Sequence, residues 1–158
     1  MTLKTVLLAI YTYLPAYVAN ASPVVLGGGS PLDGGRLWRD GKPLLGSHKT
    51  VKGAALGFLA GLMVGVAQGN PLGGCLQALG AIGGDLVGSF YKRRVDIQPG
   101  GSLPLSDQLD FIVLAVALSY PAQLTPWEQV AAILLVTLPI HYLVNMVAWV
   151  LRLKKNPW

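Results

Sequence analysis

The chain is poor in charge, in cysteine and in histidine. Only 12% of its 158 residues are charged, whereas 53% are hydrophobic, and the charged share of an ordinary globular domain is about a quarter. The single cysteine, Cys75, lies within an apolar segment and can form neither an internal disulfide nor a thiolate metal site. The sequence contains no Gly-x-Ser-x-Gly element, no candidate catalytic triad and no zinc-binding motif. An internal disulfide, a zinc site and a serine-nucleophile triad are therefore excluded.

Apolar residues instead occur in long blocks, without the stripes of an amphipathic helix. This pattern is typical of a polytopic membrane protein, and it predicts an all-α membrane domain over residues 1–158. Pro15 and Pro139 are expected to bend the first and last helices. The N-terminal apolar run lacks a convincing cleavage region, so it is interpreted as a retained helix and not as a signal peptide. Five transmembrane helices are predicted, at about residues 3–22, 53–69, 71–91, 108–124 and 127–150.

Basic residues lie almost entirely in two long loops, 27–52 and 92–107, and in the C-terminal tail. With five spans these regions share one side of the membrane, and eleven of the twelve Lys and Arg residues lie there. The positive-inside rule makes that side cytoplasmic and places the N-terminus outside. The net charge of +5 is thus attributed to topology and not to nucleic-acid binding. We expect a multi-pass protein of the cell membrane with its active site facing the cytoplasm.

Glycine recurs at every fourth residue in two of the predicted helices. One series runs from Gly53 to Gly69, and the other is Gly80, Gly84 and Gly88. This spacing places each series on one helix face, where backbones can approach closely, so helix packing is the favoured interpretation. Gly84 and Gly88 also flank Asp85 and could clear space for a ligand.

The segment 84–110 holds four of the six aspartates in an otherwise apolar chain. Asp107 and Asp110 lie three residues apart at the start of the fourth predicted helix and share one face. Carboxylates at the edge of a bilayer are costly and are functional candidates by default. At the end of the third predicted helix, another face is shared by Asp85, Ser89 and Lys92.

Helices three and four are expected to form a hairpin that brings these carboxylates together. Three carboxylates without histidine or cysteine suit a hard cation such as Mg²⁺. The alternative is that the aspartates pair with the basic residues 92–94 and that Asp107 only caps its helix. Asp96 is interpreted as a solvated loop charge.

The first loop supplies complementary charge. Lys49 and Thr50 precede the second predicted helix, whose N-terminal N–H groups favour an anion. A P-loop is rejected because two residues separate Gly46 from Lys49 and no strand precedes them. Lys49 therefore either binds phosphate or, with Lys52, faces lipid headgroups.

Three further polar residues lie in predicted helices. Asn20, at the inner end of the first helix, could bond a ligand or another helix. His141 and Asn145 are one turn apart in the last helix, and an interhelical hydrogen bond is the favoured interpretation.

Together these elements resemble the signature of membrane phosphatidate cytidylyltransferases, the CDP-diacylglycerol synthases. The segment Pro31-Leu32-Asp33-Gly34-Gly35, the small size and the five spans resemble the archaeal branch, the CDP-archaeol synthases. The chain departs from the bacterial pattern in a shorter loop before Asp107 and in Gln108, where arginine is usual. The matching elements are Gly84-Asp85, Ser89, Lys92-Arg93, a Pro-Gly-Gly loop, Asp107-x-x-Asp110 and Gly46-x-x-Lys49-Thr50-x-Lys52-Gly53.

The resemblance implies that CTP and 2,3-bis-O-(geranylgeranyl)-sn-glycerol 1-phosphate react to give CDP-archaeol and pyrophosphate. It implies one or two Mg²⁺ ions as cofactor, and CTP and a bilayer lipid phosphate as partners; a homo-oligomer is compatible with the sequence. Catalysis is assigned to Asp85, Asp107 and Asp110, as metal ligands, and to Lys49. Contacts to nucleotide or phosphate are assigned to Lys49, Thr50, Lys52, Ser89, Lys92, Arg93, Asn20 and Asp33.

Two other functions remain open at this stage. A CDP-alcohol phosphotransferase also handles nucleotide-lipids, but Asp33-Gly34 is the only fragment of its signature here. A small transporter or channel could bind cations at intramembrane aspartates. The charged residues gather at one face, however, and do not line a path across the membrane.

Overall fold

The computed structural model describes residues 1–154 and 156, and the secondary structure in these residues is almost entirely α-helical. Lys155, one of the predicted tail cations, lies outside the described residues. The helices are α1 (Leu3–Thr12), α2 (Leu14–Leu26), α3 (Val51–Ala67), α4 (Pro71–Arg94), α5 (Ser106–Gln123) and α6 (Trp127–Val150). The predicted all-helical class is confirmed, and α6 has the predicted bounds.

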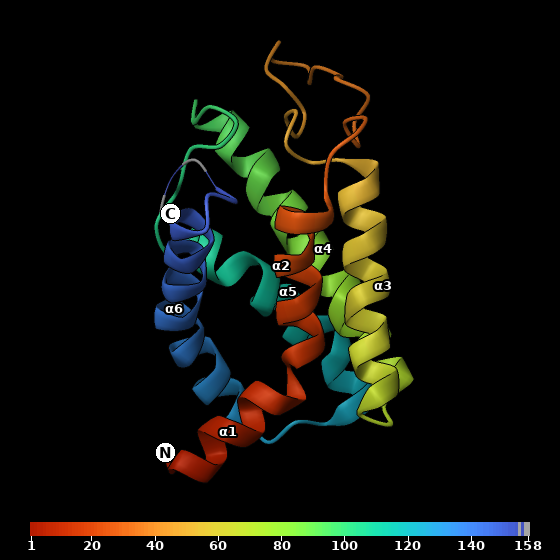
Figure 1. The fold of residues 1–158 in the computed structure, drawn as a ribbon, viewed down its shortest axis with the longest axis vertical. Helices are drawn as coiled ribbons and strands as arrows, with labels where there is room; N and C mark the ends of the chain where they lie inside the picture. Colours follow the sequence, from red (N-terminus) through yellow and green to blue (C-terminus); the bar gives the residue numbers. More distant parts are fainter. Residues whose placement is uncertain (155, 157–158) are drawn as a thin grey trace.

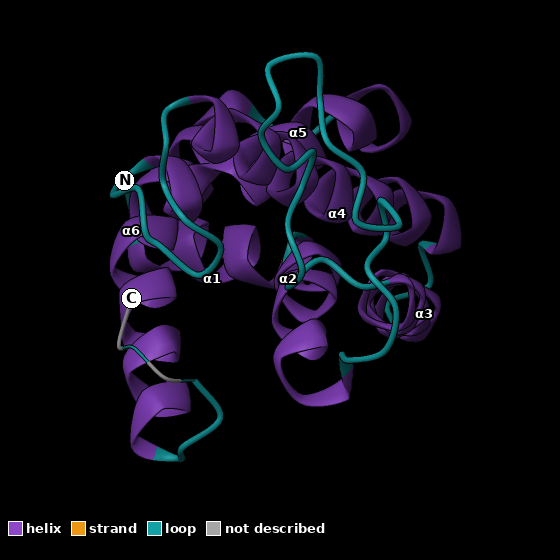
Figure 2. Cartoon of the chain, turned by 90° about the horizontal axis from the view of Figure 1, so that it is seen from above, coloured by secondary structure: helices purple, strands orange, loops and turns teal. Residues whose placement is uncertain are grey.

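The two long loops lie at one end of the helical bundle (Figure 1). The N-terminus and the short α3–α4 and α5–α6 connections lie at the opposite end, and the C-terminal end of α6 lies on the side of the loops. Seen from above, the loops pass over the ends of the helices (Figure 2). The charged loops and the tail therefore share one end of the molecule.

The first predicted helix is in fact two helices, which meet at Tyr13. Pro15 occupies the first turn of α2, where its missing N–H costs no hydrogen bond because the first N–H groups of a helix have no partner. The predicted bend at Pro15 is thus a break just before it. Tyr13 is fully buried, and its hydroxyl donates to Thr125 Oγ1 at 3.2 Å. Pro139 lies within α6, and the bend expected there stays a prediction.

Glycine contacts set the helix spacing. A Cβ at Gly61 of α3 would lie 2.7 Å from the Pro15 carbonyl oxygen and 2.9 Å from Ala78 Cβ. A Cβ at Gly80 of α4 would lie 2.5 Å from Ala115 Cα of α5. Such distances leave no room for a side chain, so the predicted packing role is confirmed for the glycines within α3 and α4. It was wrong for Gly69, which follows the end of α3 with a φ of +73° and where a Cβ would meet nothing within 4 Å. The buried core is correspondingly rich in alanine.

Apolar side chains also cover much of the outer surface of the helices. Among the described residues, α6 is the one helix whose length and composition are sufficient to cross a membrane. The helices α1, α2 and α3 are apolar but shorter. Exposed apolar residues occur on every helix, among them Leu7, Val25, Met63, Val87, Leu118 and Leu135. Exposed apolar surface of this extent marks a protein that contacts lipid or another protein.

We predict that Gly61→Ala destabilises the bundle by about 1–3 kcal/mol, because the added methyl group must separate α3 from α2 or α4. Gly83→Ala is the matched control, since a Cβ there would meet only the end of the Leu114 side chain, at 3.2 Å. Thermal unfolding of the purified variants in detergent measures the difference. Equal melting temperatures for the two variants would contradict the packing argument.

Candidate active site

A cavity of about 1000 Å³ lies where the two loops meet the helix ends. Its walls come from α2, the start of α3, α4, the start of α5, α6 and both long loops. Most of the residues singled out in the sequence line it, although they are far apart in the chain. They are Asn20, Lys49, Thr50, Asp85, Ser89, Lys92, Arg93 and Asp107.

Lys49 and Asp85 form an ion pair on the cavity wall. Lys49 Nζ donates to both carboxylate oxygens of Asp85, at 2.7 and 2.6 Å. The lysine comes from the first loop and the aspartate from α4, so the pair fastens the loop to the helix bundle. The alternative in which Lys49 faces lipid headgroups does not describe this arrangement.

Lys92 and Asp107 form a second and more buried ion pair. Lys92 Nζ lies 2.7 Å from Asp107 Oδ1, and the two side chains are only 14% and 20% exposed. The other carboxylate oxygen of Asp107 accepts a hydrogen bond from the Leu103 N–H at 3.0 Å. The contact of Asp107 Oδ1 to Lys92 is an ion pair without hydrogen-bond geometry, and among the described residues this buried oxygen has no hydrogen-bond donor.

Arg93 lies beneath the first loop and is 5% exposed. One of its terminal nitrogens donates to the Gln98 carbonyl at 3.1 Å, while its buried Nε has no hydrogen-bond partner among the described residues. A buried guanidinium N–H without an acceptor is costly, and Arg93 also lines the cavity. Arg93 therefore adds positive charge beside the cavity.

Thr50 caps α3 and anchors the start of the first loop. Its hydroxyl oxygen accepts from the N–H groups of Gly53, at 3.1 Å, and Gly28, at 3.3 Å. Backbone hydrogen bonds between residues 30–32 and 49–51 continue this attachment. Thr50 thus has a clear structural role beside its predicted contact with phosphate.

Asp33 organises the first loop from within and does not line the cavity. Its carboxylate accepts from the N–H groups of Gly35, Leu45 and Gly46 at 2.9, 2.9 and 3.3 Å. Burial acts to raise the pKa of Asp33, but these hydrogen bonds together outweigh it and lower the pKa below its ordinary value. The predicted nucleotide contact is thus not evident, and Lys52, which is exposed, is also absent from the cavity wall.

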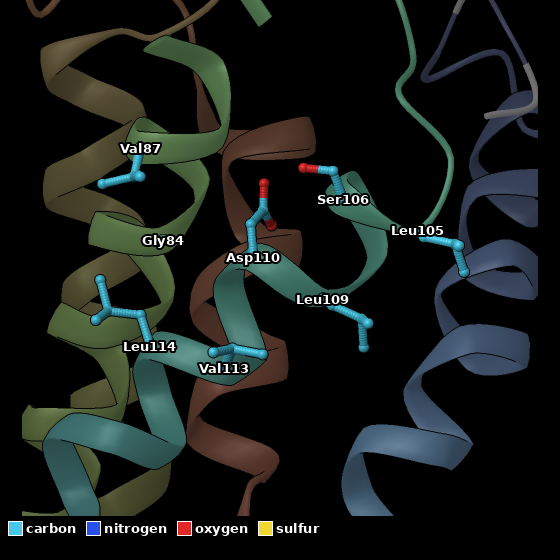
Figure 3. Close-up of a pocket in the computed structure, with 8 residues that line it drawn as sticks. All are labelled: Gly84, Val87, Leu105, Ser106, Leu109, Asp110, Val113 and Leu114. Carbon is cyan, nitrogen blue, oxygen red and sulfur yellow. The ribbon is translucent and has the colours of Figure 1, made fainter. Parts of the chain in front are cut away.

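Asp110 lies at the contact between α4 and α5 and not on the main cavity wall. It lines an adjacent apolar groove of about 530 Å³, where Ser106 points toward it (Figure 3). A Cβ at Gly88 would collide with the Asp110 carboxylate, so the glycine is what admits this side chain. Within the described residues no three His, Cys, Asp or Glu side chains are grouped to hold a metal ion, and the predicted cluster of three carboxylates is not preformed.

The end of α4 holds the first loop through several charged contacts. Arg94 Nε lies 3.2 Å from Asp40 Oδ2, and the Arg94 guanidinium stacks 4.7 Å from the centre of the Phe90 ring. Lys42 Nζ lies 2.7 Å from Asp96 Oδ1. Asp96 is solvated as predicted, with its side chain 77% exposed, but it has a partner that the sequence did not indicate, because Lys42 comes from the other loop. Asp40 had no assigned role in the sequence.

The α6 wall carries a polar set that sequence reasoning had not placed in the site. Asn145 Nδ2 and His141 Nδ1 are 3.1 Å apart, and Lys154 Nζ donates to Asn145 Oδ1 at 2.9 Å. All three line the same cavity. The bond expected between helices is instead made within α6 and to the tail.

The chain can be compared with proteins of known family. The family model described as "CarS-like: CDP-archaeol synthase" matches residues 2–158. The chain belongs to the CDP-archaeol synthase family. It is 41% identical to the CDP-archaeol synthase of Methanopyrus kandleri, over 94% of this chain and 91% of that protein. It is 40% identical to that of Pyrococcus furiosus, over 97% of this chain and 98% of the relative.

A solved structure has the same fold as this family member. The structure, described as "Structural insight into an intramembrane enzyme for archaeal membrane lipids biosynthesis", is 42% identical to this chain, with a TM-score of 0.75. The match covers 89% of this chain and 94% of the other. The resemblance drawn from the sequence motifs is thus confirmed, and the family member is related to an intramembrane enzyme.

Gly46 offers a test of how the first loop covers the cavity. It has a φ of +103°, and a Cβ there would lie 3.1 Å from a terminal nitrogen of Arg93 and 3.2 Å from Pro99. We predict that Gly46→Ala weakens CTP binding by about tenfold, because the methyl group displaces Arg93 and the backbone is strained.

Gly41→Ala is the control for the strain alone, because Gly41 also has a positive φ, +76°, but a Cβ there would meet nothing within 4 Å. Calorimetric titration with CTP compares the two variants. The loop arrangement would be refuted if both variants bound CTP as the wild type does, or if Gly41→Ala lost as much affinity.

Proposed function

We propose that the protein is a CTP-dependent cytidylyltransferase of archaeal ether-lipid synthesis. The substrates are CTP and 2,3-bis-O-(geranylgeranyl)-sn-glycerol 1-phosphate, and the products are CDP-archaeol and pyrophosphate. Family membership supports the activity. The observation that carries the proposal is the convergence of Lys49, Lys92, Arg93, Asp85 and Asp107 on one cavity. Neither the phosphotransferase nor the transporter alternative has comparable support.

The proposed topology has five membrane crossings, with α1 and α2 together forming the first. The N-terminus lies outside, and the loop end of the bundle lies in the cytoplasm, in agreement with the positive-inside rule. Support comes from the two long loops, which carry most of the lysines and arginines and lie at one end of the bundle (Figure 1). This orientation exposes the cavity to soluble CTP.

Asp85 and Asp107 would hold Mg²⁺ together with oxygens of the nucleotide. Mg²⁺ is commonly bound by one or two carboxylates plus substrate phosphates, which fits two cavity-lining carboxylates better than a closed protein cage. Both carboxylates already face an ammonium, Asp85 that of Lys49 and Asp107 that of Lys92, so their surroundings favour a cation. Bound Mg²⁺ would supply neutralisation of phosphate charge. Asp110, one helical turn from the cavity wall, would act behind Asp85 and Asp107.

The chain's own residues would orient two anions toward each other. A phosphomonoester has a second pKa near ~6, so the lipid phosphate is largely ionised at neutral pH and needs no general base. One of its oxygens attacks the α-phosphorus of CTP, a new P–O bond forms, and the bond to the β-phosphate breaks to release pyrophosphate. Lys49, Lys92 and Arg93 neutralise the phosphates during this exchange. Ser89, buried at 3% exposure beside them, adds a hydroxyl to the wall.

The lipid would enter from the bilayer between α2 and α6. The cavity is lined by Val24 of α2 and Tyr142 of α6, and both side chains are more than 40% exposed. Deeper in the bundle the Tyr17 hydroxyl and Thr137 Oγ1, 2.5 Å apart, connect the same two helices. This bond would form the floor of the entry, and an isoprenoid chain could lie above it while the phosphate enters the cavity.

We predict that Asp107→Asn lowers kcat by about a hundredfold or more, because it removes the negative charge that would hold Mg²⁺ beside the phosphates. The assay combines purified protein, Mg²⁺, labelled CTP and the lipid phosphate, and measures pyrophosphate and CDP-lipid. Asp96→Asn is the control, since the Asp96 side chain is 77% exposed and asparagine tolerates its positive φ of 62°.

The control should keep activity within about twofold of the wild type, as expected for an exposed ion pair. Unchanged activity of Asp107→Asn would remove Asp107 from the mechanism. Absence of CDP-lipid with the wild type under any lipid or metal condition would overturn the proposed function itself.

A further inference from the structure

The chain reverses direction after α6 and brings Lys154 back over the last helical turn. Arg152 adopts a left-handed conformation with φ of 59°, which is the usual way to end a helix. The N–H groups of Leu153 and Lys154 then donate to the Ala148 carbonyl, at 2.9 and 3.3 Å. As a result Arg152 is exposed, whereas Lys154 lines the cavity.

Lys154 is held in the cavity by a short chain of hydrogen bonds. Its Nζ donates to Asn145 Oδ1 at 2.9 Å, and the Asn145 amide nitrogen lies 3.1 Å from His141 Nδ1. The His141 ring is stacked on Phe111 of α5, with the ring centres 6.0 Å apart. An amide oxygen accepts a hydrogen bond, so Asn145 orients the ammonium of Lys154.

The ammonium of Lys154 interacts electrostatically with the charged residues of the proposed reaction centre. Burial lowers the pKa of Lys154, and the charges of Asp107, Lys49, Lys92 and Asp85 act on it in turn. Lys49 and Lys92 approach from the first loop and from α4. Lys154 instead approaches from the end of α6, the helix that borders the proposed lipid entry.

We propose that Lys154 binds the phosphate of the lipid substrate and that Asn145 and His141 are positioning residues for it. The proposal rests on the proposed function, which requires a dianionic lipid phosphate to approach the triphosphate of CTP. A cation on the α6 side would offset the repulsion between these anions and hold the attacking phosphate near the entry. The residues that bind CTP would then differ from the residue that binds the lipid.

The test compares Lys154→Met and Lys154→Arg with the control Arg152→Met. Arg152 lies two residues from Lys154 and is exposed. Arg152→Met removes one positive charge, as Lys154→Met does, but outside the cavity. Lys154→Met should raise KM for the lipid phosphate by about ten- to a hundredfold, the effect of losing a charged hydrogen bond, with KM for CTP within about twofold. Lys154→Arg should restore part of the loss, and Arg152→Met should behave as the wild type.

Positioning is tested separately with Asn145→Ala. Asn145→Ala should raise KM for the lipid phosphate less than Lys154→Met does. The double variant Asn145→Ala with Lys154→Met should have nearly the KM of Lys154→Met alone, since both changes act on the same ammonium. A purely structural role would instead lower the melting temperature and change both KM values. Full additivity in the double variant would overturn the positioning role.

A binding measurement separates this proposal from the proposed function. Thermal stabilisation of the protein in nanodiscs is recorded with lipid phosphate alone and with CTP alone. Loss of the lipid effect with retention of the CTP effect in Lys154→Met supports the assignment, even if turnover is absent. An unchanged response to lipid phosphate, or a selective loss of the CTP response, would overturn it.

Discussion

Helix backbones can touch only where side chains are absent, and this constraint determines where the charged groups of the protein lie. Gly80, Gly84 and Gly88 lie along one face of α4. The first two allow the backbone of α5 to pack directly against α4, and Gly88 admits the side chain of Asp110. A hairpin this close brings Asp85 of α4 and Asp107 of α5 to the wall of one cavity. Larger residues in α4 would separate the helices and so the carboxylates. The packing role and the chemical role of these glycines are therefore the same.

The loops complete a site that the helices alone leave unfinished. Lys49 reaches Asp85 because its loop is held internally by Asp33 and externally by the contacts of Arg94 and Lys42 with their partners. The carboxylates and the lysines neutralise each other across the cavity. A nucleotide arriving with a divalent cation brings the same two kinds of charge, so each side chain could exchange its partner without a large change in net charge. This account explains why strongly charged groups are tolerated at the edge of an apolar bundle.

Much of the fold was predictable from the sequence because helix periodicity is local. The apolar blocks located the helices to within a few residues, and the spacing of four in the glycine series indicated their packing faces. The helix face shared by Asp85, Ser89 and Lys92 also follows from periodicity alone. Only the short connection between α3 and α4 and the first loop are needed to bring Lys49 to this face.

What could not be predicted depends on how loops and chain ends turn. Asp33 was assigned to the nucleotide, but its partners Leu45 and Gly46 lie more than ten residues away and only loop geometry brings them to it. Asp96 finds Lys42 in the other loop for the same reason. Lys154 returns to the cavity because of a left-handed residue at the end of α6, and no hydrophobic pattern signals that turn. The split of the first helix at Tyr13 reflects Pro15, whose presence was visible but whose effect was a break and not a bend.

The most direct test of this account is a crystal structure of the protein with CTP and Mn²⁺, from crystals grown in a lipid phase. Anomalous scattering then locates the metal. The account predicts nucleotide in the cavity, manganese beside Asp85 and Asp107, and Lys49 Nζ moved from Asp85 to a phosphate oxygen. Nucleotide bound outside the cavity, or metal remote from both carboxylates with the Lys49–Asp85 pair intact, would contradict it.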